Sequence, residues 1–226
     1  MTHSPEKVYP RVLPLGDTAF TIELGEGIDE ALNRRVHALD AKLTAEPIPG
    51  IIECVPTYRS LLVRYDPLQV DPNTLRGGLL ALARSSVSHD APSPGKLITV
   101  PVHYGGAHGP DLEDVARHCG LSADEVVRLH TEPLYQVAML GFAPGFTYLL
   151  GLPSALTAPR LPTPRLRVPP GSVGIAGGQT GIYALTTPGG WRIIGRTALQ
   201  LFDPTRADPF LIHAGDRVRF VPENGE

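Results

Sequence analysis

Glycine and proline interrupt this chain at short intervals along its whole length. Each occurs 24 times among 226 residues, so together they account for about a fifth of the sequence. Glycine admits turns that other residues avoid, and proline lacks the amide hydrogen that helices and sheets use. This composition argues against a helical bundle, and we expect short strands joined by many turns.

Composition sets the broad class of protein. Hydrophobic residues make up 42% of the chain and charged residues 19%, which is enough apolar material for a real core. The formal net charge of -3 argues against a polycation that binds nucleic acid. No run of about 18 apolar residues occurs, and the first residues lack the apolar stretch of a signal peptide. The simplest expectation is a soluble cytoplasmic protein with no membrane span.

The distribution of charge is more informative than its total. Residues 133–202 contain no Asp, Glu, Lys or His, and their five charges are all arginines: Arg160, Arg165, Arg167, Arg192 and Arg196. The rest of the chain has a balance of -8. A guanidinium donates two parallel hydrogen bonds to a carboxylate or phosphate, so this segment predicts either an anion site or a face that meets an acidic partner.

The first part of the chain has the pattern of a small α+β domain, residues 1–88. Alternating apolar residues predict strands at 18–24, 51–55 and 61–65, and helical spacing predicts a helix over 28–43. Asp71 and Pro72 are suited to begin a second helix. The predicted order is β-α-β-β-α.

Residues 85–95 are polar and rich in proline, so they are predicted to link this domain to a second one, residues 96–226. The second domain is expected to begin with a strand at 97–102 and two helices near 111–119 and 122–130. Short segments punctuated by Gly and Pro then predict a compact barrel. The candidate strands are 134–140, 173–176, 182–186, 191–199 and 217–221.

Searches for chemical motifs are mostly negative. The sequence has no GxxxxGK[ST] phosphate loop, no GxGxxG, no HExxH and no CxxC. Cys54 and Cys119 alone cannot form a zinc site. We therefore predict no metal site, and the residues identify no general base or nucleophile.

Several residues admit two interpretations. His103 follows a predicted strand and either reaches a pocket or has only a structural role. Trp191, the single tryptophan, is either a core aromatic or a platform that lines a pocket. The irregular segment 141–153 could line a cleft, and the glycines of 177–181 could direct backbone N–H groups at an anion.

Long ordered motifs give a resemblance that covers nearly the whole chain. They are LGDTAFTIELG near the start, VPVHYGG at residues 100–106, GFAPGFTYLLG at 141–151, and the segments 159–183 and 188–203. These motifs resemble the family of 5-oxoprolinase B subunits. The wider family includes allophanate hydrolase subunit 1 domains and a bacterial inhibitor of a sporulation kinase.

The resemblance implies an α+β domain followed by a cyclophilin-like β-barrel. It implies a protein that is inactive alone, binds the C subunit of 5-oxoprolinase directly and acts with the A subunit. Such a complex opens 5-oxoproline to L-glutamate with ATP as co-substrate. The alternative is a regulatory protein without catalysis that binds and inhibits a histidine kinase.

Taken with the arginine segment, these motifs provide candidate binding residues. Arg160, Arg165 and Arg196 are expected to include the groups that meet a substrate carboxylate or a phosphate, because no acidic residue lies near them in sequence. Arg167 and Arg192 are ranked lower. The neutral partners expected beside them are Gln179, Thr180 and Tyr183.

Overall fold

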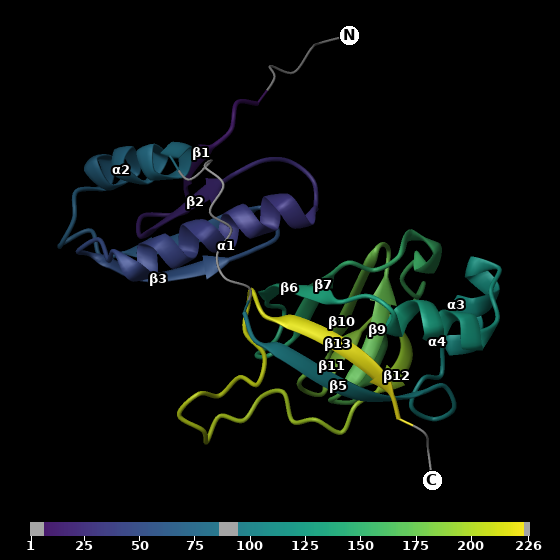
Figure 1. Cartoon of the computed structure of the whole chain (residues 1–226). Helices are drawn as coiled ribbons and strands as arrows, with labels where there is room; N and C mark the ends of the chain where they lie inside the picture. The colour runs from purple at the N-terminus through teal and green to yellow at the C-terminus, as the bar shows by residue number, and fades with distance from the viewer. Residues whose placement is uncertain (1–6, 86–94, 224–226) are drawn as a thin grey trace. The chain divides into compact units, whose positions relative to one another are not determined.

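The structure, a computed structural model, describes residues 7–85 and 95–223 (Figure 1). The chain divides into two compact units, Met1–Ser93 and Pro94–Glu226. The linker expected at 85–95 lies almost entirely outside the described residues. Each unit has its own hydrophobic core and is described by itself.

The first unit is an antiparallel sheet with the strand order β1-β2-β4-β3 and two helices. Its elements are β1 (Arg11–Pro14), β2 (Ala19–Glu23), α1 (Glu30–Ala45), β3 (Ile51–Pro56), β4 (Ser60–Tyr65) and α2 (Pro72–Ser85).

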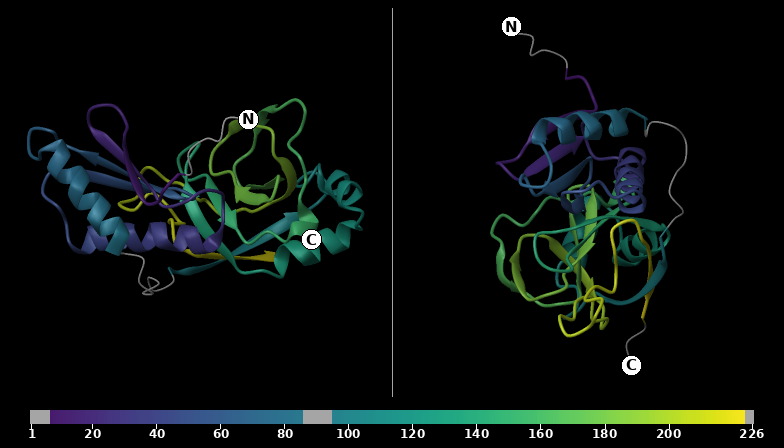
Figure 2. Two further views of the ribbon diagram at one scale, coloured as in Figure 1. Left: turned by 90° about the horizontal axis from the view of Figure 1, so that it is seen from above. Right: turned by 90° about the vertical axis from the view of Figure 1, so that its left-hand side faces the viewer.

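Helical spacing and capping explain why α1 forms. The Asp29 side chain accepts a hydrogen bond from the backbone N–H of Leu32 at 2.8 Å, which caps the first turn. Val36 and Leu39 lie on the buried face of this helix. Alternate residues of β2 and β4 are buried in the same core, so the helices cover one face of the sheet (Figure 2).

The structure adds a strand, β1, ahead of the predicted β-α-β-β-α order. It pairs antiparallel with β2, with Arg11 opposite Glu23. The strand has only four residues and ends at Pro14, so its alternation is too short to stand out in the sequence. The strand β1 is recognised by its pairing with β2 and not by its own sequence pattern.

The second unit is a closed barrel with the strand order β10-β7-β6-β13-β5-β12-β9. Strands β13 and β5 run parallel, and the other barrel pairs are antiparallel. A separate ribbon pairs β11 with β8. The elements are β5 (Leu97–Tyr104), α3 (Leu112–Cys119), α4 (Ala123–Thr131), β6 (Tyr135–Leu140), β7 (Thr147–Leu150), a 3-10 turn (Ser154–Leu156), β8 (Arg165–Val168), β9 (Ser172–Ala176), β10 (Gln179–Ile182), β11 (Thr187–Gly189), β12 (Arg192–Arg196) and β13 (Arg217–Pro222).

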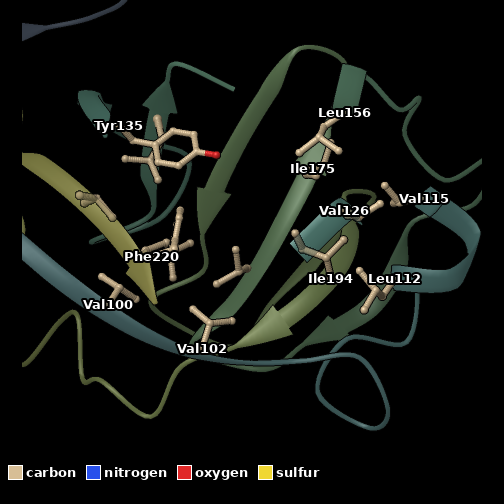
Figure 3. Packing of buried hydrophobic residues seen from close by; sticks show 14 of the residues in the cluster. Val100, Val102, Leu112, Val115, Val126, Tyr135, Leu156, Ile175, Ile194 and Phe220 are labelled. Atoms are coloured by element: carbon tan, nitrogen blue, oxygen red, sulfur yellow. The ribbon is translucent and has the colours of Figure 1, made fainter. Parts of the chain in front are cut away.

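The interior of the barrel is a packed core. Val100, Val102 and Phe220 point inward from neighbouring strands, and Figure 3 shows them in one cluster with Tyr135. Helices α3 and α4 add Val115 and Val126 to the same cluster. The barrel is therefore filled with side chains, and ligand sites must lie on its outside or at its rim.

The α+β class with a C-terminal β-barrel is confirmed, and several boundaries are corrected. Strand β7 lies inside the segment predicted to be irregular, and the strand predicted at 182–186 is β10, which ends at Ile182. Gly177 and Gly178 form the tight turn between β9 and β10. The glycine-rich segment therefore contains both the turn and the first paired residues of β10, so the sequence pattern does not show where this strand begins.

Candidate functional site

Three motif segments converge on one cavity of the second unit, which we call the aromatic pocket. Its volume is about 330 Å³. Half of the residues that line it are aromatic, and one is a cation. The lining residues are Phe142, Phe146, Tyr148, Arg160, Pro164, Tyr183, Pro188, Gly189, Gly190 and Trp191.

Phe146 is the centre of the ring cluster. Its ring lies edge-on to Tyr183, with centroids 4.8 Å apart, and to Trp191 at 5.4 Å. Gly181 makes this packing possible, because a Cβ there would lie 3.2 Å from the Trp191 ring and 2.6 Å from the Thr147 carbonyl oxygen. Trp191 is thus both a core aromatic and a wall of the pocket.

Phe142 lies at the rim of this pocket. It has a backbone φ of 65° and its residue is 65% exposed. The left-handed region is rarely occupied by a bulky residue, and such a conformation costs on the order of 1–3 kcal/mol. A strained backbone that holds an exposed ring beside a cavity is typical of a ligand-binding loop.

Arg160 brings positive charge to the aromatic pocket. Burial raises the pKa of the Tyr183 and Tyr148 hydroxyls. The nearby charge of Arg160 partly offsets that rise at Tyr148, and a hydrogen bond from the Trp191 backbone and then Arg160 offset it at Tyr183. Both phenols are therefore neutral hydrogen-bonding groups. Among the described residues no carboxylate pairs with Arg160, so its guanidinium is available to an anion.

Acidic residues of the α3 region neutralise two of the five arginines. Arg165 donates two hydrogen bonds to Asp111, at 2.8 and 2.7 Å, and Arg192 pairs with Asp114. Asp111 is only 6% exposed and also accepts a bond from the Ile193 N–H at 2.6 Å. The Arg165 guanidinium is thus engaged within the chain.

The remaining predicted partners lie elsewhere. Thr180 is fully buried inside the barrel, where its hydroxyl donates to the Gly174 carbonyl oxygen at 3.0 Å. Gln179 begins β10 at the Gly177 turn, and the Gly177 N–H donates to the Ala158 carbonyl oxygen at 2.7 Å. Of the six predicted residues, the aromatic pocket brings together Arg160 and Tyr183.

Arg196 lines a second cavity of about 580 Å³, which we call the His-Arg pocket. Its Nε donates to the Pro170 carbonyl oxygen at 3.0 Å. His103 lies directly opposite Arg196 across the β5–β12 pair. The lining residues are His103, His108, Pro170, Ala184, Leu185, Thr186, Arg196, Thr197, Ala198, Leu199, Gln200 and Phe202.

Sequence reasoning missed His108 and Asp111. His108 shares a pocket with Arg196, and Asp111 pairs with Arg165. Both pairs are far apart in sequence, so only the folding of the barrel brings them together. The available signal was the turn after β5, where consecutive glycines separate His103 from His108. Across residues 7–85 and 95–223, no three His, Cys, Asp or Glu side chains group to hold a metal, and no helix is long and apolar enough to cross a bilayer.

Comparisons with known proteins place this architecture. Residues 10–212 match the family model described as carboxyltransferase domain, subdomain C and D. The 5-oxoprolinase B subunit of Haemophilus influenzae is 51% identical over 216 residues, which cover 95% of this chain and 99% of that protein. The 5-oxoprolinase B subunit of Bacillus subtilis is 45% identical over 216 residues, 92% of this chain and 90% of its relative.

A solved structure supports the same assignment. The crystal structure of TTHA0988 superposes with a TM-score of 0.79 at 42% identity, and the match covers 92% of this chain but only 40% of TTHA0988. Family model, sequence identity and fold therefore agree over nearly the whole chain. The chain belongs to the carboxyltransferase subdomain C and D family and, within it, to the B subunits of 5-oxoprolinase.

Proposed function

We propose that this chain is the B subunit of an ATP-dependent 5-oxoprolinase, which opens the lactam of 5-oxoproline to L-glutamate and hydrolyses ATP to ADP and phosphate. The observation that carries the proposal is the identity of 45–51% to proteins of that name over more than nine-tenths of the chain. We propose that this chain acts in the cytoplasm, where ATP is available.

The chemistry explains why ATP is needed. A five-membered lactam is an amide of low electrophilicity, and its formation from glutamate is favourable. Phosphorylation of the lactam oxygen makes the ring carbon a better target for water, and coupling to ATP hydrolysis drives the opening. Such reactions need groups that hold the substrate and offset charge on the phosphoryl group.

The aromatic pocket is suited to hold 5-oxoproline. Its rings offer an apolar surface to the methylene groups of the substrate, and Arg160 offers a bidentate partner for the carboxylate. The hydroxyls of Tyr148 and Tyr183 are neutral and are placed to hydrogen-bond a lactam. We assign substrate binding to this pocket, with Arg160 as the carboxylate partner.

Catalysis is expected only in the complex. The sequence has no phosphate loop, and the described residues that line the aromatic pocket include no carboxylate or imidazole that could act as a base. We therefore propose direct association with the C subunit of 5-oxoprolinase and completion of the activity by the A subunit.

Reconstitution tests this function. The full chain is mixed with candidate A and C subunits, and L-glutamate and ADP are measured together with 5-oxoproline as substrate. We expect equal amounts of both products only when all three proteins are present. Turnover at the same rate by the other two proteins without this chain would contradict the proposal, as would turnover by this chain alone.

A further inference from the structure

The His-Arg pocket lies outside the proposed substrate site, and its polar groups share one sign of charge. Among the described residues that line it, none is acidic, whereas Arg196, His103 and His108 are cations or become so on protonation. Pockets of one sign raise the local concentration of ions of the other sign. The pocket therefore favours an anion.

The backbone explains why these three side chains meet. Arg196 and His103 are direct partners across antiparallel strands, so their side chains leave the same face of the sheet next to each other. After β5, Gly105 and Gly106 adopt φ values of 71° and 52°, which only glycine adopts readily. This turn returns the chain so that the ring of His108 lies 5.3 Å from the ring of His103.

Neighbouring bonds fix the turn and the guanidinium. The Gly105 N–H donates to the Ile194 carbonyl oxygen at 3.0 Å, which ties the turn to β12. The Nε of Arg196 is used by the Pro170 carbonyl oxygen, and no other bond holds its two terminal nitrogens among the described residues. The planar fork is thus held at one nitrogen and free to donate from the other two.

Glu223 contacts His103 and is not among the described residues that line the pocket. Its carboxylate is 3.1 Å from the Nε2 of His103, and its backbone N–H donates to the Val102 carbonyl oxygen at 2.9 Å. The contact holds the ring in its orientation. The other ring nitrogen, Nδ1, is left for a ligand.

We propose that the His-Arg pocket binds a phosphoryl group, through the terminal nitrogens of Arg196 and the rings of His103 and His108. The donors come from the end of β12, from β5 and from the turn after it, so three separate side chains line one cavity and together offer more donors than one guanidinium. The oxygens of a tetrahedral phosphate accept hydrogen bonds from several directions, whereas a planar carboxylate is satisfied by the two parallel hydrogen bonds of one guanidinium. Thr186 and Gln200 add neutral donors at the same pocket.

The apolar part of the wall supports the same ligand class. Ala184, Leu185, Leu199 and Phe202 line the cavity and reduce its contact with water, which strengthens interactions between charges. The cavity is larger than a phosphate ion needs, so the phosphoryl group can be one end of a larger molecule such as a nucleotide. This inference does not rest on the proposed 5-oxoprolinase activity.

The test uses the full chain alone, labelled with ¹⁵N. Inorganic phosphate is titrated at constant ionic strength while the ring resonances of His103 and His108 and the side-chain N–H of Arg196 are followed. Acetate and ADP are titrated in parallel. We expect phosphate to shift all three sets of resonances. If ADP binds more tightly than phosphate, the ligand is the phosphoryl group of a nucleotide; if ADP binds more weakly, the ligand is free phosphate.

Variants separate the pocket from general charge. Loss of a charged hydrogen bond predicts a weakening of about 10-fold or more for Arg196→Gln, with a smaller loss for His103→Gln. Arg128→Gln is the matched control, because Arg128 is exposed on α4, pairs with Glu132 and lines neither pocket. Unchanged resonances with phosphate, equal affinity for acetate, or equal weakening by Arg128→Gln would each overturn the proposal.

Discussion

Arg160 is the residue whose charge defines the aromatic pocket. If it holds the substrate carboxylate, Arg160→Lys keeps the positive charge but loses the two parallel hydrogen bonds. We expect the KM for 5-oxoproline in the complete complex to rise about 10- to 150-fold, because a charged hydrogen bond contributes roughly 1.5–3 kcal/mol. The kcat should change little, since this contact is made in ground and transition states alike.

Steady-state kinetics of the reconstituted complex check this prediction. Arg167→Lys is the control, because Arg167 lies in the same segment, is exposed and lines neither pocket. A KM for Arg160→Lys within about twofold of the control would show that the carboxylate is bound elsewhere, because a lost charged hydrogen bond costs more than that.

Asp111 has a different role, because it satisfies Arg165 and the Ile193 N–H together. Asp111→Asn should lower the free energy of unfolding of the barrel by about 2 kcal/mol, less than the roughly 3–5 kcal/mol of a fully buried pair since Arg165 is partly exposed. Glu113→Gln, at an exposed neighbour, should change it by under about 0.5 kcal/mol. Urea unfolding followed by Trp191 emission measures both, and equal effects would contradict the assignment.

Charge in the sequence bears on part of this site. The absence of acids from residues 133–202 pointed to arginines that need acceptors; Arg160 and Arg196 line pockets, and their binding of an anion stays a prediction. The pairing of Arg165 with Asp111 could not be predicted, because they lie 54 positions apart along the chain and only the barrel closes that distance. Thr180 points inward because side chains alternate along β10. This alternation could not be predicted, because the glycines before the strand obscure where it begins.

At the scale of elements, prediction succeeded where one segment carries its own signal. The capping box of Ser122 and Glu125 begins α4 as expected, and Gly120 ends α3 in the left-handed conformation. The short strands β1, β8 and β11 were missed, because each depends on a partner strand for its pairing. Their residues alone do not distinguish them from loops.

The contact of β10 with β7 gives a prediction at this scale. Gly181→Ala places a Cβ 2.6 Å from the Thr147 carbonyl oxygen, so the strands or the aromatic rings must shift. We expect a loss of about 1–3 kcal/mol in the stability of the barrel. Gly178→Ala is the matched control in the same hairpin, since its Cβ would enter open space. Urea midpoints within experimental error of each other would contradict this packing.

At the scale of the whole molecule, we propose that the two units are separately folded domains that join near residues 85–95. Each has its own core, and the composition between them favours a linker. Limited proteolysis of the full chain should first cut between the two units and leave a stable C-terminal fragment. Early cuts confined to residues 141–181 would contradict both this division and the packing of the aromatic pocket.

The barrel as a whole encloses the imidazole of His130. Its Nε2 lies 2.9 Å from the Thr180 hydroxyl, which itself donates to the Gly174 carbonyl oxygen, so Nε2 carries the proton. Its Nδ1 then accepts from the Tyr104 hydroxyl at 2.8 Å. Every partner is satisfied by the neutral ring, and complete burial lowers the pKa of His130 from 6.5 to about 3.

This burial makes the stability of the barrel depend on pH. Because the folded pKa lies below the unfolded one, the unfolded chain binds a proton first, and the stability present above pH 6.5 is lost as pH falls towards 3. The loss is about 1.4 kcal/mol per pH unit, or about 2 kcal/mol between about pH 6 and pH 4.5.

The emission of Trp191 measures this loss. Trp191 is the single tryptophan of the chain and lies in the second unit, so its emission reports unfolding of the barrel rather than of the first unit. His130→Gln should be less stable at neutral pH but should lack this part of the pH slope. Where that variant fails to fold, the wild-type ring resonances decide: those of His130 should stay unchanged above about pH 5, and titration of His130 near its ordinary pKa of about 6.5 would contradict the buried neutral ring.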